Sequence, residues 1–171
     1  MQKESVAIGV AGEADLPTIR RIALRTWPVT FRSILSPAQI DYMLDWLYTE
    51  ASLHGQLHRQ GHTFLLARAG GEPLGFASCE PNYQGTDKTK LHKLYVLPEA
   101  HGHGVGRALV DAVTEIAQGH GNAALRLNVN RQNVAIRFYR RLGFEVITEE
   151  NIPIGNGFLM EDYVMEKVIG V

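Results

Sequence analysis

LYVLPEAHGHGVGRAL, residues 94–109 of this 171-residue chain, joins an apolar run, a proline and three alternating glycines to the beginning of an amphipathic pattern. The apolar run predicts a strand, and the pattern from Val105 onward predicts a helix. Glycines allow unusual backbone dihedrals and close approach to a ligand, so free N–H groups at the helix N-terminus can point at an anion. The stretch therefore predicts a phosphate-binding turn between a strand and a helix.

The glycine spacing excludes two familiar phosphate motifs. The dinucleotide motif G-x-G-x-x-G would need a glycine at position 107, which is Arg107, and the chain contains no Gly-Lys-Ser or Gly-Lys-Thr of a P-loop. The pattern that remains is three glycines at alternate positions, followed directly by a helix.

A second segment, residues 127–144, reads LNVNRQNVAIRFYRRLGF and contains Asn133, Ala135, Tyr139, Arg141, Gly143 and Phe144. Together the two segments resemble the GNAT superfamily of N-acetyltransferases, whose acyl-CoA loop has the pattern Arg/Gln-x-x-Gly-x-Gly/Ala. The chain matches this pattern at Gly104 and Gly106 and differs at His101. The resemblance covers nearly the whole chain and is most specific for residues 91–144. Residues 27–48 are loosely similar to bacterial diamine and polyamine acetyltransferases.

The apolar periodicity predicts an α+β fold in one N-acetyltransferase domain over residues 1–171. The expected order is β-α-α-β-β-β-α-β-α-β-β, with one mixed and mostly antiparallel sheet between helices, as in the GNAT fold. The first helix is expected to end at Trp27-Pro28, because the residue before a proline disfavours the helical conformation. The expected strands are residues 6–10, 63–69, 74–80, 91–97, 123–129, 144–147 and 159–168, and the expected helices are 13–26, a helix that begins at Pro37, 51–60, 105–118 and 133–142.

The resemblance implies acetyl-CoA as the acyl donor. It also implies that the strand with residues 94–96 diverges from the strand with residues 127–129, so that the pantetheine arm pairs between them like an extra strand. An N–H near Val96 would then stabilise the oxyanion that develops on the thioester. The expected cofactor-binding residues are Leu94, Tyr95, Val96, His101, Gly102, His103, Gly104, Val105, Gly106, Arg107, Asn128, Asn133, Tyr139 and Arg141.

Tyr139 is the expected general acid, because the resemblance places its hydroxyl where it can protonate or stabilise the departing CoA thiolate. The general base is left open. An alkylammonium, with a pKa of about 10, must lose a proton before it attacks, but Lys90 stands where many family members have a glutamate. Glu80 and His92 are the catalytic candidates, with Tyr83 behind them, and a chain of water molecules is the alternative.

Composition and charge narrow the class of protein. The 17 Lys and Arg residues nearly balance the 18 Asp and Glu residues, and no lysine-rich tract is present, so no nucleic-acid partner is expected. No apolar run approaches the length of a membrane span. The single cysteine, Cys79, is expected in the core and cannot form an internal disulfide. These features predict a cytoplasmic protein without a membrane partner.

Three histidines, His54, His58 and His62, fall at i, i+4 and i+8, the spacing of one helix face. Gly55 and Gly61 interrupt this pattern, and no Cys or Asp shares the spacing. A solvated helix face is therefore expected, and no metal.

The sequence leaves three functions open, two of which differ in the acceptor of the acetyl group. The leading expectation is transfer to a small amine such as a polyamine or diamine, for which Asp41, Asp45, Glu50, Glu80 and Asp87 offer carboxylates. The first alternative is acetylation of a protein N-terminus or lysine. The second is a non-catalytic acyl-CoA-binding sensor, which the departures at His101 and Lys90 favour. A possible homodimer would use residues 151–167.

Overall fold

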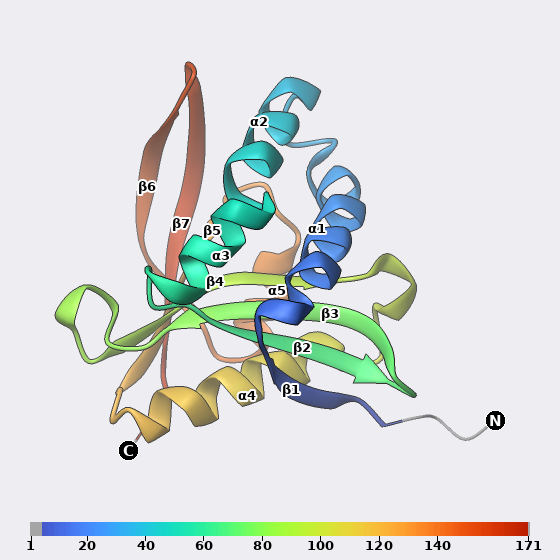
Figure 1. The fold of residues 1–171 in the computed structure, drawn as a ribbon. Coiled ribbons are helices and arrows are strands. Elements are labelled where there is room, and N and C mark those ends of the chain that lie inside the picture. Colours follow the sequence, from blue (N-terminus) through green and yellow to red (C-terminus); the bar gives the residue numbers. More distant parts are fainter. Residues whose placement is uncertain (1–4, 171) are drawn as a thin grey trace.

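The computed structural model describes residues 5–170, which form one seven-stranded sheet in the order β1-β2-β3-β4-β5-β7-β6. Helices α1 to α3 cover one face of the sheet and α4 covers the other (Figure 1). All strand pairs are antiparallel except β4 with β5, so the α+β class is confirmed. The strands are β1 (Ala7–Ala11), β2 (Thr63–Ala69), β3 (Glu72–Glu80), β4 (Lys88–Val96), β5 (Ala124–Asn130), β6 (Glu145–Gly155) and β7 (Phe158–Val168). The helices are α1 (Leu16–Phe31), α2 (Pro37–Leu47), α3 (Glu50–His58), α4 (Val105–Gly119) and α5 (Ala135–Arg141), with a 3-10 turn η1 (Glu13–Asp15) before α1.

The parallel pair β4–β5 is short. Its register runs from Lys88 opposite Ala124 to Leu91 opposite Leu127, although β4 continues to Val96 and β5 to Asn130. A register shift in the β3–β4 pairing accompanies this point, because Ser78 faces Lys93 whereas Cys79 faces Leu91, which leaves His92 as an extra residue on β4. The expected divergence of residues 94–96 from β5 is confirmed.

The expected end of the first helix at Trp27-Pro28 is wrong, since α1 continues to Phe31. Pro28 removes one backbone donor, but continuing the helix places Trp27 and Phe31 one turn apart on the buried face. Their ring centroids lie 4.4 Å apart, and both side chains are almost fully buried. Burial of two large aromatic side chains outweighs the single missing hydrogen bond.

Three other elements differ from expectation. The segment expected as residues 51–60 is a third full helix between β1 and β2, α3, and it ends at His58 so that His62 lies outside it. Helix α5 begins at Ala135 rather than at residue 133, because the Asn133 Oδ1 accepts the Ala135 N–H at 2.9 Å. Strand β6 extends to Gly155 instead of ending at residue 147, because it pairs with β7 along that length.

The long β6–β7 hairpin projects beyond the rest of the sheet and is supported by α2 (Figure 1). The Tyr42 hydroxyl donates to the Ile154 carbonyl at 2.6 Å, and the Gln39 amide donates to the Leu159 carbonyl at 3.0 Å. A homodimer through this hairpin stays a prediction. Within residues 5–170, no helix is both long enough and apolar enough to span a bilayer.

We predict that Tyr48→Phe destabilises the fold. The indole N–H of Trp27 donates to the Tyr48 hydroxyl at 3.2 Å in the core, and the substitution leaves that buried donor without its partner. The free energy of unfolding should fall by about 1–3 kcal/mol in urea denaturation. Tyr83→Phe, at a partly exposed tyrosine, serves as the control and should change it by less than about 0.5 kcal/mol. Equal effects of the two substitutions would contradict the prediction.

Candidate active site

The glycine turn between β4 and α4 has the geometry of an open cradle. Gly102 and Gly104 have φ angles of +79° and +78°, and a Cβ at either position would meet no atom within 4 Å among the described residues. The first intrahelical hydrogen bond of α4 runs from the Ala108 N–H to the Gly104 carbonyl at 3.0 Å, so the preceding amides are left for a ligand. The turn therefore combines free donors with unobstructed space, which fits a phosphate.

Gly106 has a different role from the other two glycines. It lies inside α4, and a Cβ there would come within 3.1 Å of the Phe138 ring on α5. The lack of a side chain at Gly106 lets Phe138, the residue before Tyr139, pack against α4. Gly106 therefore joins the two sequence motifs in space.

The turn is tied to the end of β4 by His101. Its Nε2 lies 2.9 Å from the Val96 carbonyl oxygen, so the imidazole holds the turn against the last residue of the strand. The side chains of His103, Arg107 and Arg141 are exposed, and none forms a hydrogen bond or ion pair with another described residue. These side chains are therefore available to form charge-assisted hydrogen bonds with a phosphate.

Tyr139 is buried between Phe138 and Phe144, whose ring centroids lie 5.3 and 5.6 Å from its own. Its hydroxyl makes no hydrogen bond to any other residue of the described chain, and burial raises its pKa above the ordinary value. The pKa of Tyr95 on β4 is likewise raised, first by burial and then by Tyr48 and Tyr139. Tyr139 is thus protonated at neutral pH and lies near the diverging end of β4.

The alternative base candidates Glu80 and His92 lie in one cluster. The His92 Nε2 is 3.0 Å from the Glu80 Oε1, and His62 stacks on His92 with ring centroids 4.1 Å apart. The Tyr83 ring meets His92 edge-on at 5.6 Å, and the Lys90 Nζ lies 3.3 Å from the Tyr83 hydroxyl. His92 is the extra residue on β4, so the cluster lies where β4 and β5 begin to diverge.

The protonation states in this cluster differ from those of exposed groups. Burial first, and then the charges of Lys93 and Lys90, lower the pKa of His62 to about 3. Burial first, and then His62, Lys90 and Lys93, lower the pKa of His92 to about 2. Burial raises the pKa of Glu80, and Lys90 partly opposes this. Both imidazoles are therefore neutral at pH 7, and Glu80 is more basic than an ordinary carboxylate.

Lys93 is a buried cation that sequence reasoning missed. Burial lowers its pKa to about 7, and its Nζ donates to the Gln56 Oε1 at 2.7 Å. The signal was present in the sequence, because Lys93 occupies a position in the alternating series of Leu91 and Tyr95 whose other members are apolar or aromatic. A lysine there predicts a charged group facing inward.

A carboxylate pair lies on the other side of the divergence. Asp162 on β7 is 6% exposed and is opposite Glu150 on β6 and Asn130 on β5. The Asn128 amide donates to the Asp162 Oδ2 and the Glu150 Oε2, each at 3.3 Å. The Asp162 Oδ1 is buried without a hydrogen-bond partner among the described residues, and burial raises the pKa of this carboxyl. A buried, unpaired carboxylate oxygen is costly and indicates a missing partner.

These carboxylates are not the ones that the sequence offered for a polyamine. Asp41, Asp45, Glu50 and Asp87 are exposed on the surface, and only Glu80 belongs to a buried cluster. Asp162 escaped notice because β6 was expected to end at residue 147, whereas its pairing with β7 continues and brings Glu150 beside Asp162.

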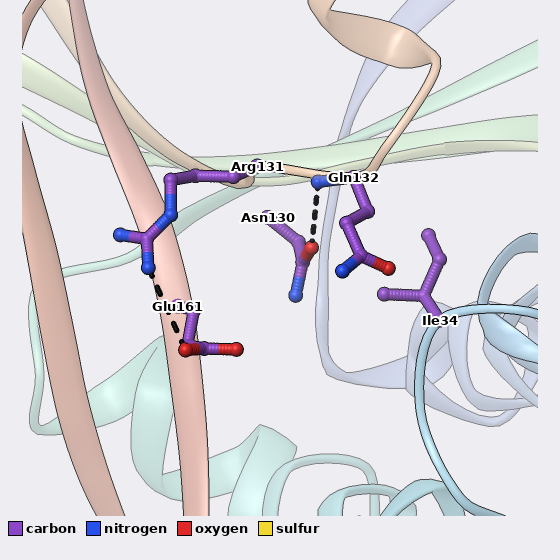
Figure 2. A pocket seen from close by; sticks show the side chains of 5 residues that line it. All are labelled: Ile34, Asn130, Arg131, Gln132 and Glu161. Carbon is purple, nitrogen blue, oxygen red and sulfur yellow. Dashed lines mark hydrogen bonds and ion pairs between the residues drawn. The ribbon is translucent and has the colours of Figure 1, made fainter.

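A small recess of about 50 Å³ lies at the end of β5, lined in part by Asn130, the residue opposite Asp162. Figure 2 shows its lining: Ile34 from the α1–α2 loop faces Gln132, while Arg131 reaches Glu161, 3.6 Å away. The Asn130 Oδ1 accepts the Gln132 N–H at 2.9 Å, which fixes the turn after β5. The loop between α1 and α2 thus borders the diverging end of β5.

Two groups of side chains in residues 5–170 have the geometry of metal ligands. One is the buried cluster of His62, Glu80 and His92, and the other is an exposed group of Glu13, His54 and His58. His54 and His58 are exposed as expected, but His62 is buried away from them. Glu13 could not be linked to the histidines by spacing, because it comes from η1.

Comparison with known proteins gives a family match over residues 16–144, to the acetyltransferase (GNAT) family. The chain is 28% identical to a spermidine N(1)-acetyltransferase of Thermoplasma acidophilum, covering 92% of this chain and 96% of that protein. It is 33% identical to an L-methionine sulfoximine/L-methionine sulfone acetyltransferase of Pseudomonas aeruginosa, covering 83% and 81%. The crystal structure of the PaiA N-acetyltransferase of Thermoplasma acidophilum in complex with coenzyme A superposes with a TM-score of 0.79 at 27% identity, covering 96% and 99%.

We predict that His62→Gln reduces the acid sensitivity of the fold. The unfolded chain binds protons at His62 and His92 as the pH falls through about 6.5, whereas the native imidazoles do not until about pH 3 and 2. The contribution of these two neutral histidines to the free energy of unfolding is therefore fully present above about pH 6.5, and it is lost as the pH falls from there toward 3. Urea unfolding at pH 7.5, 6.0 and 5.0 should show a smaller loss in the variant. An identical pH dependence in both proteins would contradict the prediction.

Proposed function

This chain belongs to the GNAT acetyltransferase family, and we propose that it moves the acetyl group of acetyl-CoA to a primary amine of a small polyamine or diamine. The enzyme is an N-acetyltransferase, and the proposal concerns its acceptor and the roles of its residues. The observation that carries the proposal is the buried Oδ1 of Asp162, which has no hydrogen-bond partner within residues 5–170 and lies beside Glu150, near the diverging ends of β4 and β5. A single domain over residues 1–171 provides both substrate sites.

Acetyl-CoA fits the unpaired edge of β4 and the free amides of the glycine turn. Residues 94–96 have a backbone edge that β5 does not pair, so an extended pantetheine arm can hydrogen-bond there as an added strand. Gly102 and Gly104 leave space and free amides for the pyrophosphate at the N-terminus of α4. The donor supplies a thioester carbonyl, and the Val96 N–H is placed to stabilise negative charge on its oxygen.

Glu80 is the better of the two candidate bases. Its pKa is raised by burial, whereas that of His92 is lowered to about 2, so a neutral His92 is a poor proton acceptor. His92 Nε2–H donates to the Glu80 Oε1 and orients the carboxylate. The reaction releases one proton per transfer, from the substrate ammonium, and Glu80 passes it toward solvent. His92 is thus a positioning residue.

Tyr139 acts as a hydrogen-bond donor to the departing sulfur. A thiol has a pKa of about 8.5, well below the raised pKa of the Tyr139 phenol. Complete proton transfer from the phenol to a thiolate is therefore unfavourable, whereas a hydrogen bond from a protonated hydroxyl stabilises the developing charge. This role needs the hydroxyl to be free of protein partners, as it is within the described chain.

Asp162 and Glu150 bind the cationic acceptor. An ammonium group donates up to three hydrogen bonds, and the Asp162 Oδ1 is an acceptor with no other partner among the described residues. The Asn128 amide holds both carboxylates in place, which makes Asn128 an acceptor-side residue in this proposal. A second ammonium on a diamine or polyamine would gain from Glu150.

The test is release of the CoA thiol from acetyl-CoA in the presence of separate acceptors: spermidine, spermine, putrescine, single amino acids, and peptides with a free N-terminus or lysine. We expect turnover with polyamines at kcat/KM at least about tenfold above that of the peptides. Turnover confined to peptides would replace the acceptor proposal by the protein-acetylation alternative. Tight CoA binding with no turnover on any amine would contradict the proposed function.

We predict that Tyr139→Phe lowers kcat by about 100-fold, the cost of removing one donor from a developing charge. The dissociation constant of CoA, measured by calorimetry, should change by less than about twofold because the ring remains. Tyr163→Phe on β7 is the matched control and should keep the wild-type kcat. An unchanged kcat in the Tyr139 variant would remove this hydroxyl from the chemistry.

We predict that Asp162→Asn raises the KM for the polyamine by about 10- to 100-fold, as expected for losing a charged hydrogen bond of about 1.5–3 kcal/mol. The KM for acetyl-CoA should not change. Stability should be unchanged or higher, because a buried unpaired charge is removed. Glu149→Gln, which removes the same charge from an exposed side chain, is the control. A lower stability with an unchanged KM would mean that Asp162 is only structural.

A further inference from the structure

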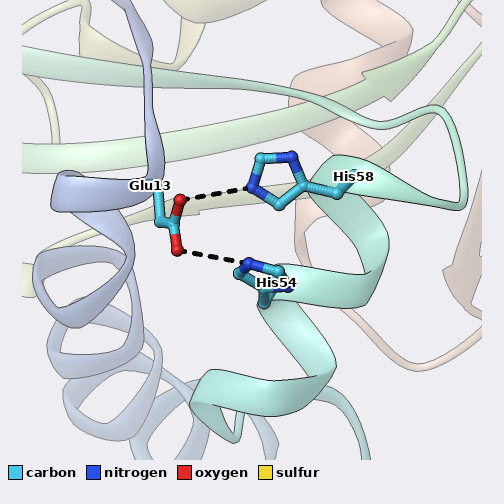
Figure 3. Close-up of side chains that lie close together, drawn as sticks. All are labelled: Glu13, His54 and His58. Atoms are coloured by element: carbon cyan, nitrogen blue, oxygen red, sulfur yellow. Dashed lines mark ion pairs between the residues drawn. The ribbon is translucent and has the colours of Figure 1, made fainter.

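A group of three side chains outside the proposed active site converges on one point. His54 and His58 lie one turn apart on α3, and Glu13 lies on η1, before α1. The His54 Nε2 is 3.2 Å from the Glu13 Oε1, and the His58 Nε2 is 3.6 Å from the Glu13 Oε2. Figure 3 shows both imidazoles turned toward the carboxylate, which extends from the other element to meet them.

The spacing of these atoms matches that of ligands around one metal ion. Histidines at i and i+4 share a helix face, and here their ring centroids are 4.3 Å apart. Two ligand atoms at about 2.0–2.1 Å from a tetrahedral Zn²⁺ lie about 3.3 Å from each other. The two observed Nε2–oxygen distances lie close to this value, and all three ligand atoms can lie within 4.8 Å of one another.

Ion pairing alone gives a weaker account of the arrangement. The three side chains are 45–65% exposed, and exposed pairs of this kind contribute little to stability. Two imidazoles and one carboxylate from separate elements are, in contrast, a donor set that late first-row divalent cations bind well. Exposure also leaves the remaining coordination positions open to water.

The buried group of His62, Glu80 and His92 offers the same donor types in a less suitable setting. Lys93 and Lys90 lie close enough to lower the pKa of both histidines, and the same positive charges repel a dication. No lysine or arginine pairs with Glu13 among the described residues. The exposed group is therefore the better metal site.

We propose that Glu13, His54 and His58 form a surface site for Zn²⁺ or a similar late first-row divalent cation, which links α3 to the beginning of α1. The two elements are brought together by the fold rather than by sequence spacing, so binding should select the folded state and stabilise it. Because protons and the metal compete for the same imidazole nitrogens, binding should weaken in acid. The site does not depend on the proposed acetyltransfer chemistry.

The test is calorimetric titration of the full chain with ZnCl₂ at pH 7.5 and 5.5, with MgCl₂ and CaCl₂ in parallel. We expect Zn²⁺ to bind at one site per chain, more weakly at pH 5.5, with no comparable binding of the oxygen-preferring ions. His54→Ala, His58→Ala and Glu13→Gln should each weaken Zn²⁺ binding by at least about tenfold, since even residues outside the coordination shell cost about 10- to 100-fold. His120→Ala, at the exposed histidine that directly follows α4, should bind as the wild type does.

A second measurement guards against variants that are poorly folded. The thermal midpoint of the wild type should rise with ZnCl₂ and return with EDTA, while the His54→Ala/His58→Ala double variant keeps the metal-free midpoint and its circular dichroism. The proposal is overturned if the wild type binds no Zn²⁺. It is equally overturned if the double variant retains wild-type affinity, because the ion would then bind elsewhere on the chain.

Discussion

The divergence of β4 from β5 after the pair Leu91–Leu127 is the constraint on which the rest of the structure depends. Two parallel strands that part midway leave backbone donors and acceptors without partners, which is costly unless water or a ligand satisfies them. The bulge at His92 precedes residues 94–96, which β5 does not pair, and the hydrogen bond between His101 and the Val96 carbonyl lies at their end. The glycine turn follows β4 after a 3-10 turn at Pro98–Ala100, so an open strand edge is followed in the chain by an open turn that fits a phosphate.

The same divergence organises the charged groups. Glu80 and His92 lie on β3 and β4, on one side of the divergence. Asp162 and Glu150 lie on β7 and β6, on the other side. Tyr139 on α5 lies near the Tyr95 side chain. Gly106 gives room to Phe138 and so sets α5 against α4. A packing requirement in one motif therefore helps to position Tyr139, the proposed hydrogen-bond donor of the other.

The sequence predicted the parts of this arrangement that depend on local spacing. The run of residues 63–69 before a glycine turn predicted β2 at its observed bounds, Ser36 and Pro37 marked the beginning of α2, and the glycines marked the beginning of α4. It failed where tertiary packing overrides local preference: Pro28 stays helical because Phe31 is buried, and β6 continues because β7 pairs with it. Asp162 and Glu13 were missed because their partners are distant in sequence, so no periodicity joins them. Lys93 differs, because its place in the alternation of Leu91 and Tyr95 did carry a signal.

Hydrogen exchange of the backbone amides, with and without saturating CoA, tests the central claim most directly. If the diverging edge and the glycine turn together hold the donor, exchange should slow at residues 94–96 and at residues 102–107, while the already paired Leu91 changes little. CoA binding that slows exchange at neither segment, or at the turn alone, would contradict the account, because the pantetheine arm would then not lie along β4.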